Sequence, residues 1–436
     1  MVKKCKMQYY TGLKAFRCLV FGTLLGIWHS LPAQNTPGIT LAKAYEAVVK
    51  TYPLTRNSAV YDSLMEIQNR EVNLQRLPQL HLLGEGSYQS ESLQAPASVP
   101  FPLDVPKYSY RAYGELELVL YEGGRLNTAI LKNKLEKEVN QKELDVALYS
   151  LKDRVNGLFF AILLARVQQS LLSTSMTDVD TQLQTVKARY DQGAALKSDV
   201  NRLQVKKLEL QSAFDDLKGT INARTGVLRD LSGLPVYPES SLELPEVESL
   251  PFRDSVARPE IALFDAQSVA LLTEKELVRA GNLPRISAFA QGGYSDPNRF
   301  NLFDTDGKEF ALGGVRLSWN LFDWGIAKNR RMELDMRRSS LLHQKETFVH
   351  NIATRQSEYR ENSLKMREKI AKDTEIAALQ KDILRQYDSQ LEHGVINVTD
   401  YLLQLNTELR ARQQLELDKI ELQRLYVDYL TLFGNP

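Results

Sequence analysis

The stretch "GVINVTD", residues 394–400, interrupts a region rich in lysine and glutamate that otherwise favours helix. A glycine can end a helix because it alone takes the left-handed conformation without strain, and Thr or Asp can cap the helix that follows. The stretch therefore predicts a tight turn between two helices. A second stretch, "GAALKSD", residues 193–199, has the same form, with Gly followed six positions later by Asp.

Several other features also occur twice. Gly193 and Gly394 lie 201 positions apart, as do Asp199 and Asp400. The motif "LYEGGRLN" from residue 120 matches "LFDWGIAKN" from residue 321 at the same offset, and "LPQLHLLGEGSY" from residue 77 matches "LPRISAFAQGGYS" from residue 283 at an offset of 206. Features that recur in one order at a near-constant period predict an internal duplication. The change of offset falls in a loop, where insertions are tolerated.

Each half is expected to contain a helix, a strand, a loop, a second strand, a long helix, a turn and a shorter helix. The first helix is expected from about Leu41 to Arg76, ending before Pro78. Apolar residues alternate with polar or charged ones between Tyr108 and Tyr121, which predicts a strand that is wet on one face only. Strands are expected at about residues 77–88, 108–121, 284–295 and 310–322.

The long helices are expected between Gly124 and Gly193 and between Gly325 and Gly394, because neither segment contains proline. At about 1.5 Å per residue, each would be on the order of 100 Å long. Apolar residues after the first turn, among them Leu203, Leu210 and Leu228, recur at steps of three and four. This pattern predicts a coiled-coil seam interrupted by Lys207 and Arg224. The turns at about 190–199 and 391–400 would then be the tips of two antiparallel helical hairpins.

The N-terminus has the layout of a secretory signal. Lysines and arginines precede an apolar run from Leu19 to Trp28 that is too short to span a membrane, and cleavage is expected after Ala33. Both cysteines, Cys5 and Cys18, would be removed with it. The expected divisions are a signal peptide at 1–33, a first repeat at 34–231, a connector at 232–259 and a second repeat at 260–436.

The exported chain is expected to reach a membrane through its strands. Beyond the signal we expect no apolar segment long enough to be a membrane helix, and the other spanning structure is a closed barrel. Four strands cannot close a barrel, which needs about eight, whereas three chains would supply twelve. Aromatic residues near the strand ends would form the interfacial girdle: Tyr88, Tyr108, Tyr110, Tyr294, Trp319 and Phe322.

These features together resemble the TolC family of outer-membrane efflux proteins. The resemblance covers the chain after the signal and rests on "ITLAKAYEAVVKTYP", "LYEGGR", "LFDWGI", "RYDQGAALKSDV" and "EHGVINVTDYL". It implies a mainly helical homotrimer with a 12-stranded membrane β-barrel continued by an α-helical barrel in the periplasm. It also implies a duct that passes small molecules or proteins from an inner-membrane transporter, through a periplasmic adaptor (membrane fusion) protein, to the exterior.

The resemblance also implies roles for residues at the tips. Asp199 and Asp400 match the acidic position that lines the periplasmic entrance in that family, and three copies of each would form rings that favour cations. Capping of the following helix is an alternative role for both, and the two roles are compatible. Leu391 and Ile396 stand where family members can carry latch residues, so the latch itself is not expected here. The tip turns would dock the adaptor through Tyr190, Gly193, Ser198, Gly394 and Thr399, and Gly124 and Gly325 would mark the strand-to-helix junctions.

Other classes of protein fit the sequence less well. The net charge of +1 gives no reason to expect nucleic-acid binding. We find no glycine-rich phosphate loop and no nucleophile with an evident base, so neither a catalytic site nor a cofactor is expected. His343, Glu346 and His350 share a helical face but are expected to be solvated rather than to bind metal. The alternatives that remain are a periplasmic coiled-coil adaptor or a structural surface protein without channel activity.

Overall fold

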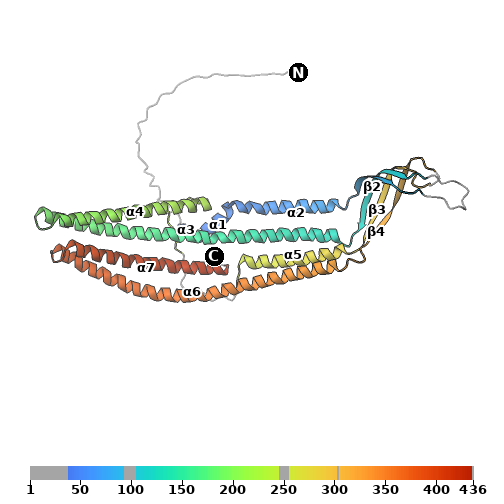
Figure 1. Cartoon of the computed structure of the whole chain (residues 1–436). Helices are drawn as coiled ribbons and strands as arrows, with labels where there is room; N and C mark the ends of the chain where they lie inside the picture. Colours follow the sequence, from blue (N-terminus) through green and yellow to red (C-terminus); the bar gives the residue numbers. More distant parts are fainter. Residues whose placement is uncertain (1–37, 93–104, 245–254, 302–303, 435–436) are drawn as a thin grey trace, which may run out of the picture. The chain divides into compact units, whose positions relative to one another are not determined.

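A computed structural model describes residues 38–92, 105–244, 255–301 and 304–434 (Figure 1). The described residues belong to one compact unit. The expected signal peptide, with Cys5 and Cys18, lies outside the described residues.

The described chain is mainly helical and contains one small sheet. In chain order the elements are α1 (Leu41–Thr51), a short 3-10 helix (Pro53–Arg56), α2 (Asn57–Leu74), β1 (Gln79–Tyr88), β2 (Tyr108–Tyr121), α3 (Arg125–Asp191), α4 (Lys197–Ser232), α5 (Pro259–Gly281), β3 (Arg285–Asp296), β4 (Lys308–Ser318), α6 (Ile326–Glu392) and α7 (Val398–Phe433).

The first helix is broken, contrary to the expectation of one helix from about Leu41 to Arg76. The α1 helix ends at Thr51, and Tyr52 is extended in front of Pro53. A residue before proline is disfavoured in the helical conformation, because the proline ring clashes with its backbone. Pro53 therefore divides the predicted helix in two.

The four strands form one antiparallel sheet in the order β1-β2-β3-β4. The expected fourth strand, about 310–322, is wrong at its end, because β4 stops at Ser318. Ser318 pairs with Arg285, the first residue of β3, and the chain before Arg285 is the turn after α5. Residues 319–322 therefore have no strand beside them with which to extend the ladder.

The two long helices are confirmed: α3 and α6 are each unbroken over 67 residues. Each packs against the helix that follows it, α3 against α4 and α6 against α7 (Figure 1). Three residues of the apolar series that predicted the seam, Leu203, Leu210 and Leu228, are buried in α4. Lys207 interrupts the seam but binds Asp180 of α3, with 2.5 Å between Nζ and Oδ1, so it joins the two helices.

The two hairpins and the N-terminal helix share a core. Phe159 and Ile162 of α3 are fully buried and cluster with Val48 of α1, Leu228 of α4 and Val427 of α7. Contrary to the sequence expectation, α3 is long and apolar enough to cross a membrane by length and composition alone. About 44% of its most apolar window is buried within the chain. Its packing in this core therefore accounts for part of the apolar composition.

Candidate functional site

The two tips are turns of the same design. The chain leaves α3 at Asp191 and α6 at Glu392, and the glycines that follow, Gly193 and Gly394, have φ of 77° and 73°. A residue with a side chain is strained in this left-handed region. The expectation of glycine-terminated helices at both tips is therefore confirmed.

The caps of the second helices lie earlier than the sequence suggested. Ser198 and Thr399 already belong to α4 and α7. The N-cap of α7 is Asn397, whose side chain accepts a hydrogen bond from the backbone N–H of Asp400 at 3.0 Å. In α4, the carboxylate of Asp199 accepts a hydrogen bond from the backbone N–H of Leu196 at 3.4 Å. Capping is thus observed for the Asp199 side chain.

Most predicted tip residues are open to solvent. Tyr190, Ser198, Thr399 and Asp400 are exposed, whereas Asp199 is half-buried. Exposed side chains at the end of two helical hairpins are available to a partner.

Two arginines that the sequence analysis missed join one tip to the other. Arg189, in the last turn of α3, donates from Nη1 to the backbone carbonyl of Leu391 in α6 at 2.7 Å. A Cβ added to Gly394 would lie 2.7 Å from the Arg189 guanidinium, so the arginine side chain packs closely over this turn. Arg202 of α4 donates from Nη1 to the Thr399 hydroxyl of α7 at 2.8 Å.

The tips also share an apolar core. Leu203 of α4 and Leu391 of α6 are buried with Val398 and Tyr401 of α7 in one cluster that reaches Val186 of α3. All four helices therefore contribute to a single packed end. A movement that separates the hairpins must break both this cluster and the arginine contacts.

At the opposite end, glycines mark the passage from sheet to helix. Gly124 and Gly325 have φ of 79° and 82° and are the N-caps of α3 and α6. Before α6, the Asp323 carboxylate accepts hydrogen bonds from the backbone N–H groups of Gly325 at 2.9 Å and Ala327 at 2.8 Å. These bonds lower the pKa of Asp323, because they stabilise the carboxylate.

One face of the sheet is apolar and exposed. Residues that pair directly in an antiparallel ladder point to the same face, and the register places large apolar side chains from all four strands together. The exposed large members of this apolar face are Leu80, Leu82, Tyr88, Tyr108, Tyr110, Leu116, Tyr294, Val315 and Leu317. Soluble monomers rarely expose so continuous an apolar surface, so this face is suited to contact with lipid or protein.

The opposite face of the sheet is mixed: it carries the charged side chains together with Tyr113, Phe289 and Phe310. Glu115 of β2 pairs with Arg316 of β4 at 3.0 Å, although the strands lie two apart in the sheet. Gln291 of β3 donates to Glu115 at 2.5 Å and accepts from Arg299 at 3.2 Å. A strip that is apolar on one side and charged on the other can separate lipid from water.

This arrangement recurs in solved structures. The outer membrane protein VceC from Vibrio cholerae matches with a TM-score of 0.63 and 15% identity, over 91% of this chain and 96% of that one. CusC matches with a TM-score of 0.67 and 14% identity, over 91% and 92% of the two chains. The Neisseria gonorrhoeae outer membrane channel MtrE, in its open state, matches with a TM-score of 0.59 and 16% identity, over 91% and 89%.

The chain has the fold of the TolC-family outer-membrane channels. No protein-family model and no curated relative match the sequence. The solved structures with this fold are channel proteins rather than enzymes.

Within this TolC-like fold, the structure reveals a polar cluster between the hairpins that sequence reasoning missed. Gln182 of α3 donates to Asp388 of α6 at 3.0 Å, and Tyr401 of α7 is fully buried beside it. Burial raises the pKa of the Asp388 carboxyl and of Asp178 in α3, because charged carboxylates are disfavoured away from water. Glu408, also buried, accepts a hydrogen bond from Arg412 Nε at 2.8 Å.

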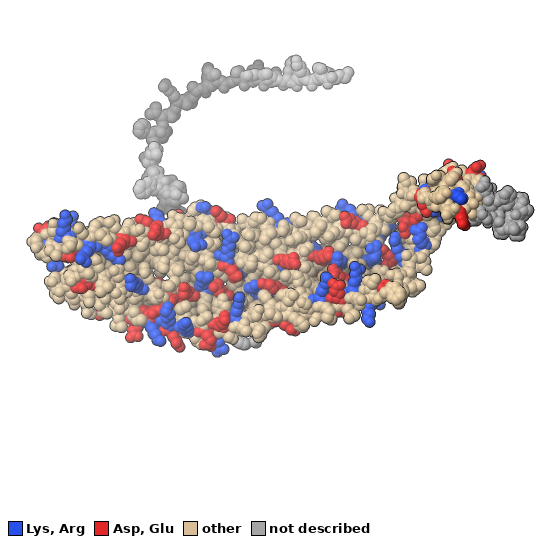
Figure 2. All heavy atoms as spheres, viewed as in Figure 1, with Lys and Arg blue, Asp and Glu red and all other residues tan. Residues whose placement is uncertain are grey.

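Among the residues that the structure describes, no three His, Cys, Asp or Glu side chains are grouped so as to hold a metal ion. His343, Glu346 and His350 are exposed along α6. Figure 2 shows lysines and arginines interspersed with aspartates and glutamates along the helices on the face in view. That mixture is typical of a solvated surface rather than of a nucleic-acid interface.

Proposed function

We propose that this protein is the outer-membrane exit duct of a tripartite efflux or type I secretion system. The observation that carries the proposal is the sheet with one apolar, exposed face and one charged face, joined directly to two 67-residue helices. In the proposed arrangement the sheet contributes to a barrel in the outer membrane, its apolar face meets lipid, and the helices extend through the periplasm. The shared fold with outer-membrane channels supports this arrangement.

We further propose that the two halves, 34–231 and 260–436, are equivalent repeats on either side of a connector at 232–259. Contacts at matched positions support this. Lys137 of α3 binds Asp62 of α2 at 2.5 Å, and Arg338 of α6 donates to Ser268 of α5 at 2.9 Å. The long-helix residues differ by 201 positions and the short-helix residues by 206, the two offsets found in the sequence.

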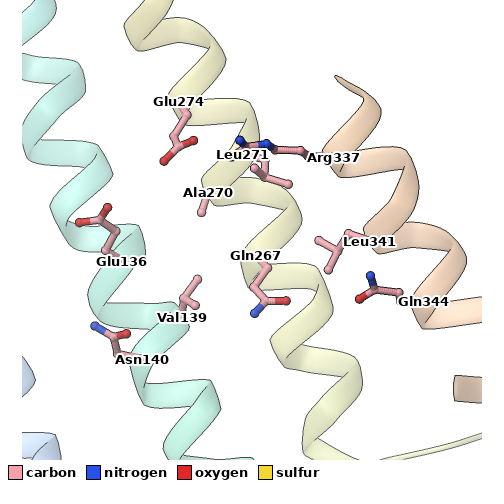
Figure 3. A pocket seen from close by; sticks show the side chains of 10 residues that line it. All are labelled: Glu136, Val139, Asn140, Gln267, Ala270, Leu271, Glu274, Arg337, Leu341 and Gln344. Carbon is pink, nitrogen blue, oxygen red and sulfur yellow. The ribbon is translucent and has the colours of Figure 1, made fainter. Parts of the chain in front are cut away.

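Under this equivalence α5 corresponds to α2, but the two helices have different neighbours. The α5 helix packs against both α6 and α3, and the three enclose a groove of about 490 Å³ (Figure 3). Figure 3 shows Glu136 and Val139 from α3 and Gln267 from α5 on its walls, with Leu341 from α6. Among the described helices, α2 packs only against α3 and the short 3-10 helix. The α5 helix thus has two long helices as neighbours, α6 and α3, whereas α2 has only one, α3.

The residues of α2 that match the buried face of α5 are exposed, as expected for a helix that lacks its second neighbour. Ala266, Thr273 and Ala280 form a stripe on α5 that is 6–7% exposed. The face of α5 that bonds to α6 is a different one, formed by Asp265, Ser268 and Lys275. Because the stripe lies away from that face, it is on the side of α3. The matching stripe on α2 is Val60, Ile67 and Leu74, and these are 57%, 51% and 51% exposed.

We infer that α6 of a second copy covers this stripe, because α6 is the equivalent of α3. Contact between different surfaces, α2 of one copy and α6 of the next, generates a ring. Three copies would join four strands each into a 12-stranded barrel, which exceeds the minimum of about eight. A homotrimer is the assembly that we propose.

Cross-linking tests this assembly. Lys132 of α3 and Glu274 of α5 line one groove, and their equivalents are Glu333 of α6 and Gln68 of α2. With Cys5 and Cys18 replaced by serine, the pair Gln68→Cys and Glu333→Cys is expected to give covalent dimers and trimers with a short bismaleimide. The matched pair Lys132→Cys and Glu274→Cys should cross-link within one chain and leave its mass unchanged. Monomers alone from the first pair would rule out the proposed seam.

We propose that the tips dock a periplasmic adaptor that connects the duct to an inner-membrane transporter. Tyr190, Ser198 and Thr399 are exposed at the tips, and Gly193 and Gly394 permit the turns. In a trimer, Asp199 and Asp400 would contribute six carboxylates to a constriction at the periplasmic entrance, which would attract cations.

The ring predicts a change in conduction. Asp400→Ala removes three charges from the entrance of a trimer, so block by a multivalent cation should weaken or single-channel conductance should rise. Planar-bilayer recordings at low salt measure both, because low salt keeps the charges unscreened. Glu392→Ala, also at an exposed position near the tip, is the control. Unchanged block and unchanged conductance for Asp400→Ala would remove the proposed role.

A further inference from the structure

Trp324 has an unusual conformation at the junction between β4 and α6. It is the one residue other than glycine with a positive φ, 54°, in the part of the chain that the structure describes. A residue with a side chain is strained in this left-handed region. The indole stacks edge to face on Phe322, with 4.7 Å between ring centroids, but Trp324 remains 85% exposed. Burial within its own chain therefore does not offset the strain.

The matching position in the first half is a glycine in a crowded place. Gly123, 201 positions earlier, has φ of 65°. A Cβ on Gly123 would lie 2.5 Å from the Leu283 Cβ and 3.0 Å from the Ala280 carbonyl oxygen, so no side chain fits there. The turn between α5 and β3 fills the space.

In the second half, the residues that would cover Trp324 in the same way are far from it in the chain. At the offset of 206, the equivalent of Leu283 is Leu77, in the turn between α2 and β1, and the equivalent of Ala280 is Leu74, the last residue of α2. Both are exposed, at 54% and 51%. They belong to the α2 side of the chain, whereas Trp324 belongs to the α6 side. In a ring these two sides meet between copies.

We propose that Trp324 closes the seam between neighbouring copies by packing on Leu77 and Leu74 of the next copy. This inference rests on the proposed ring and adds one difference between the two kinds of junction. No side chain fits at Gly123, within a chain, whereas a tryptophan stands at the matching position between copies. The junction between copies must therefore be wider at Trp324 than the junction within a chain is at Gly123. The indole fills the extra width and buries three apolar side chains at the level where the sheet meets the helices.

A lipid surface is the competing occupant, because tryptophan is enriched at membrane interfaces. The copy-to-copy contact is favoured here because both of its sides are exposed apolar residues at matched positions. In addition, Gly123, the residue that matches Trp324 in the first half, lies directly against the turn between α5 and β3.

Bimane fluorescence tests the contact, since tryptophan quenches bimane at short range. Bimane is attached at Leu77→Cys in the assembled protein, with Cys5 and Cys18 replaced by serine. Trp319 and Trp324 are the only tryptophans beyond Trp28. Trp324→Phe and Trp324→Gly are each expected to brighten bimane severalfold. Trp319→Phe is the control and should leave it unchanged, because the Trp319 indole donates to the Asn282 carbonyl at 3.1 Å in its own chain.

The outcomes separate this inference from the assembly on which it rests. If the cross-link between Gln68→Cys and Glu333→Cys forms but bimane brightness does not respond to Trp324→Phe, the Trp324 contact is overturned while the ring stands. Quenching of Trp324 by brominated lipid, with bimane bright throughout, would assign Trp324 to the membrane instead. If the cross-link itself is absent, the ring and this inference both fail.

Discussion

Phe159→Ala is expected to lower the free energy of unfolding by about 3–5 kcal/mol, the usual cost of truncating a buried phenylalanine. Phe159 is fully buried in the cluster that unites α1, α3, α4 and α7. Helices of 67 residues have little to hold them except lateral packing, so a cavity at this level weakens the attachment of both hairpins. Thermal unfolding in detergent, followed by circular dichroism, should show a clearly lower midpoint.

The matched control for this substitution is Arg360→Ala. Arg360 occupies the same position in α6, 201 residues later, and is exposed. Substitutions at exposed sites away from special features usually change stability by no more than about 0.5 kcal/mol. Equal effects of the two substitutions would contradict the assignment of the core to the first long helix.

Arg189→Ala is expected to loosen the packed end at the tips and, in the proposed duct, to raise single-channel conductance severalfold. The substitution removes the hydrogen bond from Arg189 to the Leu391 carbonyl, and a bond from a charged donor contributes about 1.5–3 kcal/mol. In a trimer three such bonds are lost together. Planar-bilayer recordings measure the conductance directly.

Lys187→Ala provides the control for Arg189→Ala. Lys187 is exposed in the same turn of α3, so its removal changes the charge of the tip equally. A rise in conductance with both variants would attribute the effect to charge. No rise with Arg189→Ala would show that this hydrogen bond does not hold the tips together.

The sequence predicted the long helices and the tips because their signals are local. Two segments without proline, each closed by a glycine, leave helix as the expected state, and Gly193 and Gly394 do take left-handed conformations. Alternation likewise indicated strands with one polar face. The break before Pro53 was equally local and was overlooked.

The contacts at the site could not be predicted because their partners are distant or carry no sequence signal. Arg189 binds a backbone carbonyl 202 positions away, and any residue could supply that carbonyl. Asp178 and Asp388 occupy polar stretches that read as solvated helix surface, yet burial between the hairpins raises their pKa values. The early end of β4 depends on where its partner β3 begins, which strand periodicity does not reveal.

The most direct test of the proposed duct is to purify the protein from outer membranes, determine its oligomeric state and record its conductance in a planar bilayer. The account predicts a trimer that forms discrete ion-conducting channels. A monomer that forms no channels would contradict it, because the apolar face of the sheet would then serve some purpose other than lining a membrane barrel.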